Sequence, residues 1–553
     1  MKIMFKFLNI LYISTLALTI FSCDDYLDTP PVDKLTSNGF YQTQAQAEQG
    51  VLGIYTDLRQ ASNCEYWFMS ECRSDAAWVE PNPDAFREYS EIGTFRATDD
   101  MAMFNDTWNM WYKVIYDANV AISKIPNTSF TSETLKTQLV NEAYFLRGWA
   151  YFELTRLFGY VPVIDKPMSP AEIKSVKQSA PQDVINNRVL PDLKNAENLP
   201  YKDDMKDANG ANISKKGRAD KMAAKAMLAR VYMTLVGYPY NDSNAKALAK
   251  MQLESILNDS HATDYWAPSL EEWRKQWMPT DAYYNKYSIF SIQYRTGGTG
   301  NPAIFNMLPV KIVPINWSKN YNFSLNNIYV EKTLMHEFDR EYSNGKKDGR
   351  GYNFGVMSGF EADAVAPAYQ SPSETMTFED GTTCEVYTKA MFYKFIPTHV
   401  KIEGLGMSFD AESGMKKYDD WGVNLPIIRI EDMQLLYAEL LAGEGDMKNA
   451  MKIVNKIRTR ANCDALPETG ISEEDAMNYI KRERKIEFMG EGVRWFDQVR
   501  YGTWKSDTEE KFDRYNFSEL KTYLKDGRHI YPIPMNQLNV TPGLYEQNEG
   551  YRN

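Results

Sequence analysis

The stretch "SETLKTQLVNEAYFLRGWAYFELTRLFG", residues 132–159, decides the fold class of this chain. Its apolar residues recur at helical spacing, at positions Leu139, Ala143, Leu146, Ala150 and Leu154. Gly159 and Pro162 follow, and this order of glycine and proline predicts that the helix ends there. The sequence therefore predicts a long amphipathic helix that buries one face against its neighbours.

Comparable patterns on both sides of this stretch predict further helices. Residues 37–60 start with Ser37 or Asn38 as the predicted cap and then carry apolar residues at helical spacing. The other predicted helices are residues 104–126, 182–200, 216–237, 244–260, 428–463 and 474–502. Because short polar turns join them, we expect stacked antiparallel pairs in a tetratricopeptide-like scaffold, mainly over residues 36–258 and 425–502.

A different composition marks a loop-rich insert at about residues 265–424, which is rich in Tyr, Asn and Gly. Within it, "RTGGTGNP", residues 295–302, predicts a flexible loop. The stretch "YSIFSIQYR", residues 287–295, alternates like a strand. The closing residues 531–553 are rich in Pro and Asn, and we expect them to form an ordered tail laid over the helices.

The N-terminus has the pattern of a secretory signal. Lys2 and Lys6 precede a largely apolar, uncharged run that is too short to span a bilayer as a helix, and Ser22 supplies a small residue before Cys23. A core helix with a buried cysteine is the alternative, but the two aspartates that follow would end such a helix awkwardly. We therefore predict that residues 1–22 are a lipoprotein signal peptide and that Cys23 carries the lipid.

The charge of the chain excludes one class of partner. The formal net charge is −12, and removal of residues 1–22 with Lys2 and Lys6 makes it −14. An acidic chain lacks the basic footprint that nucleic acid requires. It is also repelled by anionic membrane surfaces, so membrane attachment would depend on the lipid.

No catalytic or metal-binding motif is present in the sequence: we find no HExxH, Walker loop, GxSxG or GxGxxG after a strand. Acid pairs such as Asp99 and Asp100 are candidates for a calcium ion, but exposed acids usually only solvate a surface, so we predict no metal and no cofactor. Four cysteines besides Cys23 are too few for a disulfide framework. A bridge between Cys64 and Cys72 remains open.

Several motifs together resemble one known family. In chain order they are "CDDYLDTPP", "WNMWYKVIYDANVAISKIP", "NEAYFLRGWAYFELTRLFGYVPVI", "GRADKMAAKAMLARVY", "LPIIRIEDMQLLYAELL", "VNKIRTRA", "ERKIEFMGEGVRWFDQVRYG" and "YPIPMNQ…NEGY". They resemble the SusD/RagB family of Bacteroidetes outer-membrane nutrient-binding lipoproteins, over residues 23–553. Gly148, where the family often has alanine, and Gln498, where leucine is usual, depart from the pattern.

The resemblance implies a mostly α-helical SusD-like fold, with tetratricopeptide-like helix pairs and an irregular, loop-rich ligand-binding portion. It also implies a non-enzymatic, surface-exposed lipoprotein of the outer membrane. Such a protein captures an oligo- or polysaccharide and delivers it to a SusC-like TonB-dependent β-barrel transporter. The alternative is a RagB-like importer subunit that binds peptides or glycopeptides. The identity and linkage of a glycan do not follow from the sequence.

Charged residues inside the predicted helices admit two interpretations. They are Arg147, Arg218, Glu483, Arg484, Glu487, Arg494 and Asp497. Glu487 and Asp497 would serve a glycosidase as an acid pair if they flanked a cleft. Because both lie on helices rich in arginine, we favour an ion network that locks the helices together.

The ligand residues are expected in two irregular stretches that mix aromatic and polar residues, about 63–91 and 283–327. Flat aromatic rings suit the C–H faces of sugars, and polar side chains suit the hydroxyl rim. The predicted ligand-binding residues are Tyr66, Trp67, Arg73, Asp75, Trp78, Arg295, Trp317 and Tyr321. Trp78 and Trp317 are the preferred platforms, although tryptophan is heavily buried on average.

Overall fold

The computed structural model describes most of the chain. The described residues are 40–62, 64–81, 87–214, 217–277, 286–294, 306, 308, 312, 328–352, 354–360, 369–378, 381–396 and 422–552. Helices dominate, as the sequence predicts, and strands are short. The fold is therefore mostly α-helical.

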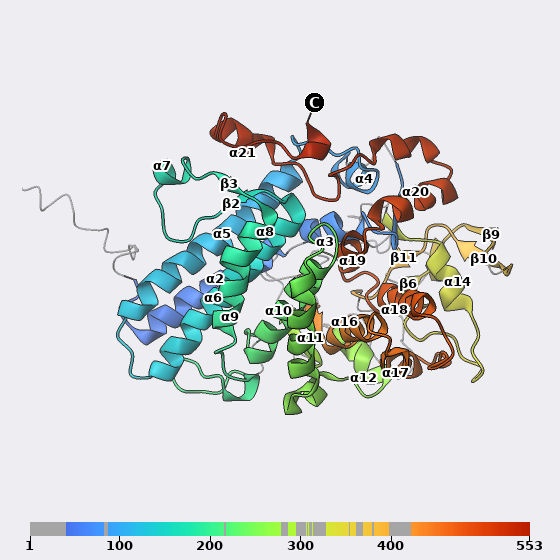
Figure 1. Ribbon diagram of the computed structural model, residues 1–553, viewed down its shortest axis with the longest axis horizontal. Helices are drawn as coiled ribbons and strands as arrows, with labels where there is room; N and C mark the ends of the chain where they lie inside the picture. Colours follow the sequence, from blue (N-terminus) through green and yellow to red (C-terminus); the bar gives the residue numbers. More distant parts are fainter. Residues whose placement is uncertain are drawn as a thin grey trace, which may run out of the picture.

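Figure 1 shows three groups of stacked helices. The first contains α2 (Gln44–Ala61), α5 (Ala102–Lys124), α6 (Glu133–Phe158), α8 (Pro181–Val184) and α9 (Leu190–Ala196). The second is the pair α10 (Lys221–Val236) and α11 (Ser243–Leu257). The third contains α16 (Ile430–Ala442), α17 (Met447–Arg460), α18 (Glu473–Glu487) and α19 (Arg494–Tyr501). Because α11 packs on α16, the second group connects the other two.

Shorter helices surround these groups. They are α3 (Cys64–Glu71), α4 (Arg87–Gly93), α7 (Pro170–Ile173), α12 (Leu270–Arg274), α14 (Thr333–Asp339), α20 (Trp504–Arg514) and α21 (Met535–Val540). Turns of 3-10 helix are η2 (Ile125–Asn127), η4 (Lys202–Asp204), η5 (Ser260–Tyr265), η6 (Lys275–Trp277), η8 (Ser518–Tyr523) and η9 (Glu549–Tyr551).

The long helix α6 follows its sequence pattern closely. The Ser132 hydroxyl accepts a hydrogen bond from the Leu135 amide at 3.2 Å and caps the first turn. Gly159 ends the helix with φ +70°, a conformation that glycine adopts without a steric penalty. A Cβ at this position would lie 2.6 Å from Ile530 Cδ1, so glycine also allows the C-terminal segment to approach.

Four helix predictions need correction. The stretches 428–463 and 474–502 each form two helices in place of one, α16 with α17 and α18 with α19. Helix α2 begins at Gln44, not after Ser37 or Asn38, because Thr43 forms a capping box with Gln46. The predicted helix over residues 182–200 is interrupted by a π-helical turn, η3 (Ile185–Val189). Pro191, just after that turn, cannot donate the hydrogen bond of a regular helix, and the wider turn accommodates it.

The strands form two-stranded antiparallel ribbons among the described residues. The pairs are β1 (Ala77–Val79) with β5 (Ile328–Val330), β2 (Val161–Pro162) with β3 (Gln178–Ser179), β4 (Ser288–Ile292) with β12 (Leu425–Arg429), β6 (Val356–Met357) with β11 (Met391–Phe392), β7 (Gly359–Phe360) with β8 (Tyr369–Gln370), and β9 (Ser373–Thr377) with β10 (Thr383–Tyr387). Strand β4 lies within the predicted alternating stretch 287–295, which confirms that prediction.

The C-terminal residues pack on the end of α6. The Tyr531 amide donates to the Leu157 carbonyl oxygen at 2.7 Å, and Asn548 Nδ2 donates to the Phe158 carbonyl oxygen at 2.8 Å. The tail is therefore ordered, as the sequence suggests, and it also forms α21 and η9. Across the described ranges, no helix is both long and apolar enough to cross a membrane.

Candidate functional site

The β1–β5 ribbon pairs part of the first predicted ligand segment with the three residues that directly follow the second. Its register pairs Ala77 with Val330, Trp78 with Tyr329 and Val79 with Ile328. Because the strands are antiparallel, the end of β1 lies beside the start of β5. Val79 and Ile328 therefore lie side by side at one end of the ribbon, although about 250 residues separate them in sequence.

A charged pair borders this end of the ribbon. Lys389 Nζ lies 2.9 Å from Glu80 Oε2, and both side chains are partly exposed. The same ammonium group lies 5.6 Å from the centre of the Tyr329 ring, and the Tyr369 hydroxyl donates to the Lys389 carbonyl oxygen at 2.6 Å. The partly exposed ammonium and carboxylate groups supply a donor and an acceptor that suit a ligand rich in hydroxyl groups. Lys389 is far from Glu80 in the sequence, so no local sequence pattern predicts that the two side chains are neighbours.

Tyr66 and Trp67 lie on α3 and are buried. The Tyr66 hydroxyl donates to Glu153 Oε2 at 2.9 Å and accepts a hydrogen bond from Arg156. Trp67 Nε1 donates to the Gly490 carbonyl oxygen at 2.6 Å. Both side chains hold α3 against its neighbours, so they are core residues and not part of an exposed loop.

Arg73 and Asp75 are also buried. The Arg73 guanidinium lies 3.9 Å from the centre of the Tyr531 ring. Arg494 Nε lies 2.7 Å from one carboxylate oxygen of Asp75, and Lys485 Nζ lies 3.0 Å from the other. Burial opposes ionisation, but these two cations outweigh it and hold the pKa of Asp75 well below its usual range. The carboxylate is therefore engaged in ion pairs inside the protein.

The prediction that Trp78 is a platform for the ligand is wrong. Its side chain is 4% exposed, and its ring stacks on Tyr515 with centroids 3.8 Å apart. Phe517 covers it further, at 5.5 Å. Both rings follow α20, a segment distant in sequence, so the polar surroundings of Trp78 in the sequence did not reveal the cover. Of the other predicted ligand residues, Arg295, Trp317 and Tyr321 lie outside the described residues, as does Cys23.

All seven charged residues are buried and ion-paired, as predicted, but Arg147 pairs with Asp192 and Arg218 with Glu142, apart from the ion network of the third helix group. At its centre, Glu487 Oε1 lies 2.9 Å from Arg429 and 2.8 Å from Arg460, while Oε2 lies 2.9 Å from Arg350. Burial disfavours the charged carboxylate, but the three guanidinium groups outweigh it and hold the pKa of Glu487 well below its usual range. Its acceptor positions are occupied, which leaves it unsuited to acid–base chemistry.

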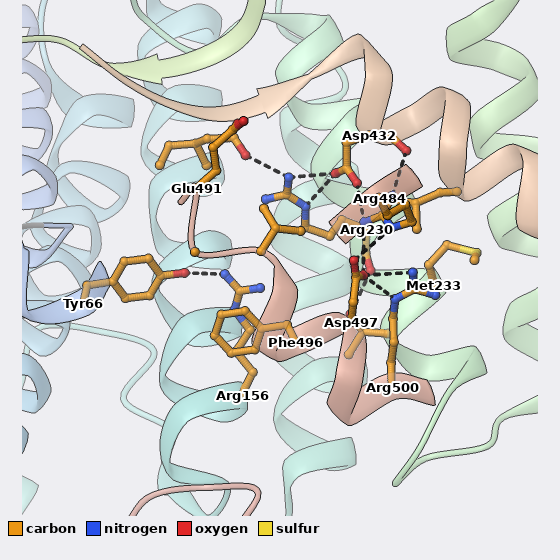
Figure 2. Close-up of a pocket in the computed structure, with 15 residues that line it drawn as sticks. Tyr66, Arg156, Arg230, Met233, Asp432, Arg484, Glu491, Phe496, Asp497 and Arg500 are labelled. Atoms are coloured by element: carbon orange, nitrogen blue, oxygen red, sulfur yellow. Dashed lines mark hydrogen bonds and ion pairs between the residues drawn. The ribbon is translucent and has the colours of Figure 1, made fainter. Parts of the chain in front are cut away.

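A small cavity lies beside the ion pairs of Arg484 with Asp432 and Asp497 (Figure 2). In Figure 2, Tyr66 and Arg156 point toward one another, and Arg230 points toward Asp432. The cavity volume is about 40 Å³, room for roughly three water molecules. A sugar ring does not fit, so the charged cavity belongs to the scaffold.

Family comparisons agree with this architecture. A model described as "SusD family" matches residues 271–551, and a model described as "Starch-binding associating with outer membrane" matches residues 25–233. The first alone covers half of the chain. The chain belongs to the SusD family.

Alignments with individual SusD-family relatives cover nearly the whole of this chain. The SusD-like protein P38 of Formosa agariphila is 24% identical over 525 residues, which are 90% of this chain and 92% of that protein. A SusD homologue of Bacteroides thetaiotaomicron has a crystal structure with a TM-score of 0.73 at 22% identity, covering 93% of this chain and 98% of that chain. A laminarin-binding SusD-like protein has a TM-score of 0.67 at 22% identity, with 92% and 100% coverage.

Among the described residues, neither a disulfide nor a metal-binding cluster forms part of the candidate site. Cys72 is a free, buried thiol, so the bridge to Cys64 is not formed. Burial raises the pKa of the Cys72 thiol well above its usual value, which keeps it protonated and unreactive. Within the described ranges, no group of three or more His, Cys, Asp or Glu side chains is placed to hold a metal ion.

The ion network predicts that this SusD-family protein loses stability in acid. Burial raises the pKa of Asp432, but Arg230 and Arg484 outweigh it and lower the pKa to about 2, from 3.8. Between these values only the unfolded chain binds the proton, so the free energy of unfolding falls as pH drops from about 4 to 2. This carboxylate alone contributes about 2 kcal/mol to that fall. Denaturant titrations across this range should show a shallower pH dependence in Asp432→Asn; an unchanged slope would contradict the assignment.

Proposed function

We propose that this chain is a cell-surface lipoprotein that binds an oligo- or polysaccharide and delivers it to a SusC-like TonB-dependent β-barrel transporter. The register of β1 and β5 supports the proposal, because Val79, in the first predicted ligand segment, pairs with Ile328, which directly follows the second. Family membership supports it, since one matching model is described as starch-binding and one relative of the same fold binds laminarin.

In this proposal Trp317 is the platform residue, and Tyr321 and Arg295 are further ligand contacts, as the sequence predicts. A tryptophan ring covers the apolar C–H face of a sugar, and a guanidinium group donates hydrogen bonds to the hydroxyl rim. Glu80 and Lys389 at the described end of the ribbon add an acceptor and a donor. Binding without cleavage is favoured, because Glu487 and Asp497 are committed to arginine partners and do not face each other across a cleft.

The lipid on Cys23 would hold the protein at the outer membrane, and the residues before Phe40 would link it to the folded part. Co-purification from native membranes tests the partner: we expect a β-barrel to accompany the tagged full-length chain. A Cys23→Ser variant is expected to be released from the membrane fraction, and a variant that stays fully membrane-bound would contradict the anchor.

The ligand platform is tested by Trp317→Ala in the chain from Asp24 onward, which keeps every described residue. Loss of the aromatic face is expected to weaken glycan binding at least about tenfold. The thermal unfolding midpoint should not change, because we place the ring in the ligand site and not in the core. Isothermal titration calorimetry with a polysaccharide that binds the wild type measures the effect. Tyr116→Ala, at a tyrosine that is 46% exposed on α5, is the matched control and should bind like the wild type.

A further inference from the structure

A second hollow lies away from the β1–β5 ribbon, between the end of α6, the turn after α10 and the C-terminal segment. We call it the tyrosine pocket and define it by Tyr160, Tyr238, Pro239, His529 and Asn548. Its volume is about 210 Å³, room for roughly a dozen water-sized groups, which is about the number of non-hydrogen atoms in one hexose. Unlike the charged cavity of about 40 Å³, it has the size of a single sugar ring.

Two exposed aromatic rings form the walls of the tyrosine pocket. Tyr160 is 49% exposed and Tyr238 is 36% exposed, and both are among the more exposed large apolar side chains of the described residues. The Tyr238 ring is held edge-on against His529, with centroids 5.3 Å apart. Its backbone is fixed as well, because its amide donates to the Arg500 carbonyl oxygen at 2.9 Å. The Tyr238 ring is therefore positioned by the fold, although water reaches both rings.

A buried polar side chain of fixed orientation also contributes to the lining of the pocket. Asn548 is 2% exposed, and its Nδ2 donates to the carbonyl oxygens of Phe158 at 2.8 Å and Tyr531 at 2.6 Å. These two acceptors determine which end of the amide is nitrogen. Its Oδ1 atom is buried and receives no hydrogen bond from the described residues. A buried acceptor without a donor is costly, so the site favours a ligand that supplies one.

His529 also contributes a buried polar atom, Nδ1, that has no hydrogen-bond partner among the described residues. Burial, together with the positive charge of Arg73, lowers the pKa of His529 to about 4. The ring is therefore neutral at pH 7, with one nitrogen that donates and one that accepts. A hydroxyl group can satisfy either nitrogen.

The charged side chains near the pocket do not favour the binding of an anionic ligand. Arg156 and Arg500 contribute to its lining, but Arg156 is paired with Glu153, and Arg500 is paired with Glu439 and Asp497. Flat apolar walls, unpaired acceptors and neutralised cations together match a neutral sugar: the rings cover its C–H face and the buried polar atoms bind its hydroxyls.

We propose that the tyrosine pocket is a second carbohydrate site, which binds one neutral sugar ring independently of the β1–β5 ribbon end. Neither Trp317 nor the lipid on Cys23 takes part in it. A protein with two separate sites can hold a long polysaccharide at two points, which raises its apparent affinity above that of either site alone.

The test uses the chain from Asp24 onward and saturation-transfer NMR with glucose, galactose, mannose, xylose, fucose and N-acetylglucosamine at millimolar concentration. We expect saturable binding of at least one sugar, weakened about tenfold in Tyr160→Ala and retained in Trp317→Ala. The exposed Tyr160 side chain makes its truncation compatible with folding. Tyr116→Ala, at a ring of similar exposure, is the control and should leave binding unchanged.

A second variant separates binding from a structural role. His529→Phe keeps a ring of similar shape and removes the unpaired nitrogen, so stability should hold or increase. Sugar affinity should nevertheless fall about two- to tenfold. If no sugar of the set gives a response that depends on Tyr160, the second site is refuted. That result would leave polysaccharide binding through Trp317 untouched, so the two proposals can be refuted independently of each other.

Discussion

Replacement of Glu487 by glutamine is expected to lower the free energy of unfolding by about 3–5 kcal/mol. The carboxylate is fully buried and balances three guanidinium groups, those of Arg350, Arg429 and Arg460. Glutamine has nearly the same shape, so the change removes one charge and little else. The three cations keep their other carboxylate partners, but one positive charge is then left uncompensated in a region that water does not reach, where such a charge is most costly.

Urea unfolding monitored by circular dichroism measures this effect, and Glu444→Gln is the matched control. Glu444 pairs with Lys250 at 2.6 Å, but both side chains are about one-third exposed. Solvent-exposed pairs of this kind contribute about 0–1 kcal/mol. A loss below about 1 kcal/mol in Glu487→Gln, equal to that of the control, would contradict the idea that this network locks the helices together.

Truncation of Trp78 to alanine is expected to destabilise the protein by about 3–5 kcal/mol. The ring is 4% exposed and is stacked between its own strand and the segment after α20, with Tyr515 at 3.8 Å. Its removal leaves a cavity that these short elements cannot fill without shifting. Thermal and urea unfolding measure the loss, and Tyr116→Ala, at an exposed tyrosine of α5, should change stability by no more than about 0.5 kcal/mol.

The same variant distinguishes a core residue from a ligand platform. As a core residue, Trp78 should affect glycan binding only in proportion to the loss of folded protein. Trp78→Phe retains most of the buried area, so it should recover part of the stability. Normal stability in Trp78→Ala combined with lost glycan binding would restore the original prediction that this ring contacts a sugar.

The helices could be predicted because their signals are local. In α6, the Ser132 cap, the apolar spacing and Gly159 all lie within one segment, and the structure places the helix between the same two residues. The existence of an ion network could also be predicted, because Arg484 and Glu487 lie on a helix rich in arginine. Both side chains are buried, and buried charges need partners of opposite sign. These inferences need no knowledge of distant contacts.

The ligand site depends on contacts that the sequence does not contain. Trp78 stands among polar residues in the chain, yet Tyr515 from a distant segment covers it. Likewise, the pairing of Val79 with Ile328 joins two segments whose proximity no local pattern indicates. Tyr160 and Tyr238 were missed because each stands alone in sequence, and their proximity to Asn548 arises only when the tail packs on α6.

The most direct test of the central claim is a titration of the chain from Asp24 onward with plant, host and microbial polysaccharides and with peptides, followed by heat and Trp fluorescence. A glycan-binding SusD-family protein is predicted to bind one class of polysaccharide saturably, with at least about tenfold weaker binding in Trp317→Ala while folding persists. Saturable binding of peptides, with none of any polysaccharide, would contradict the claim and assign the protein to peptide or glycopeptide import.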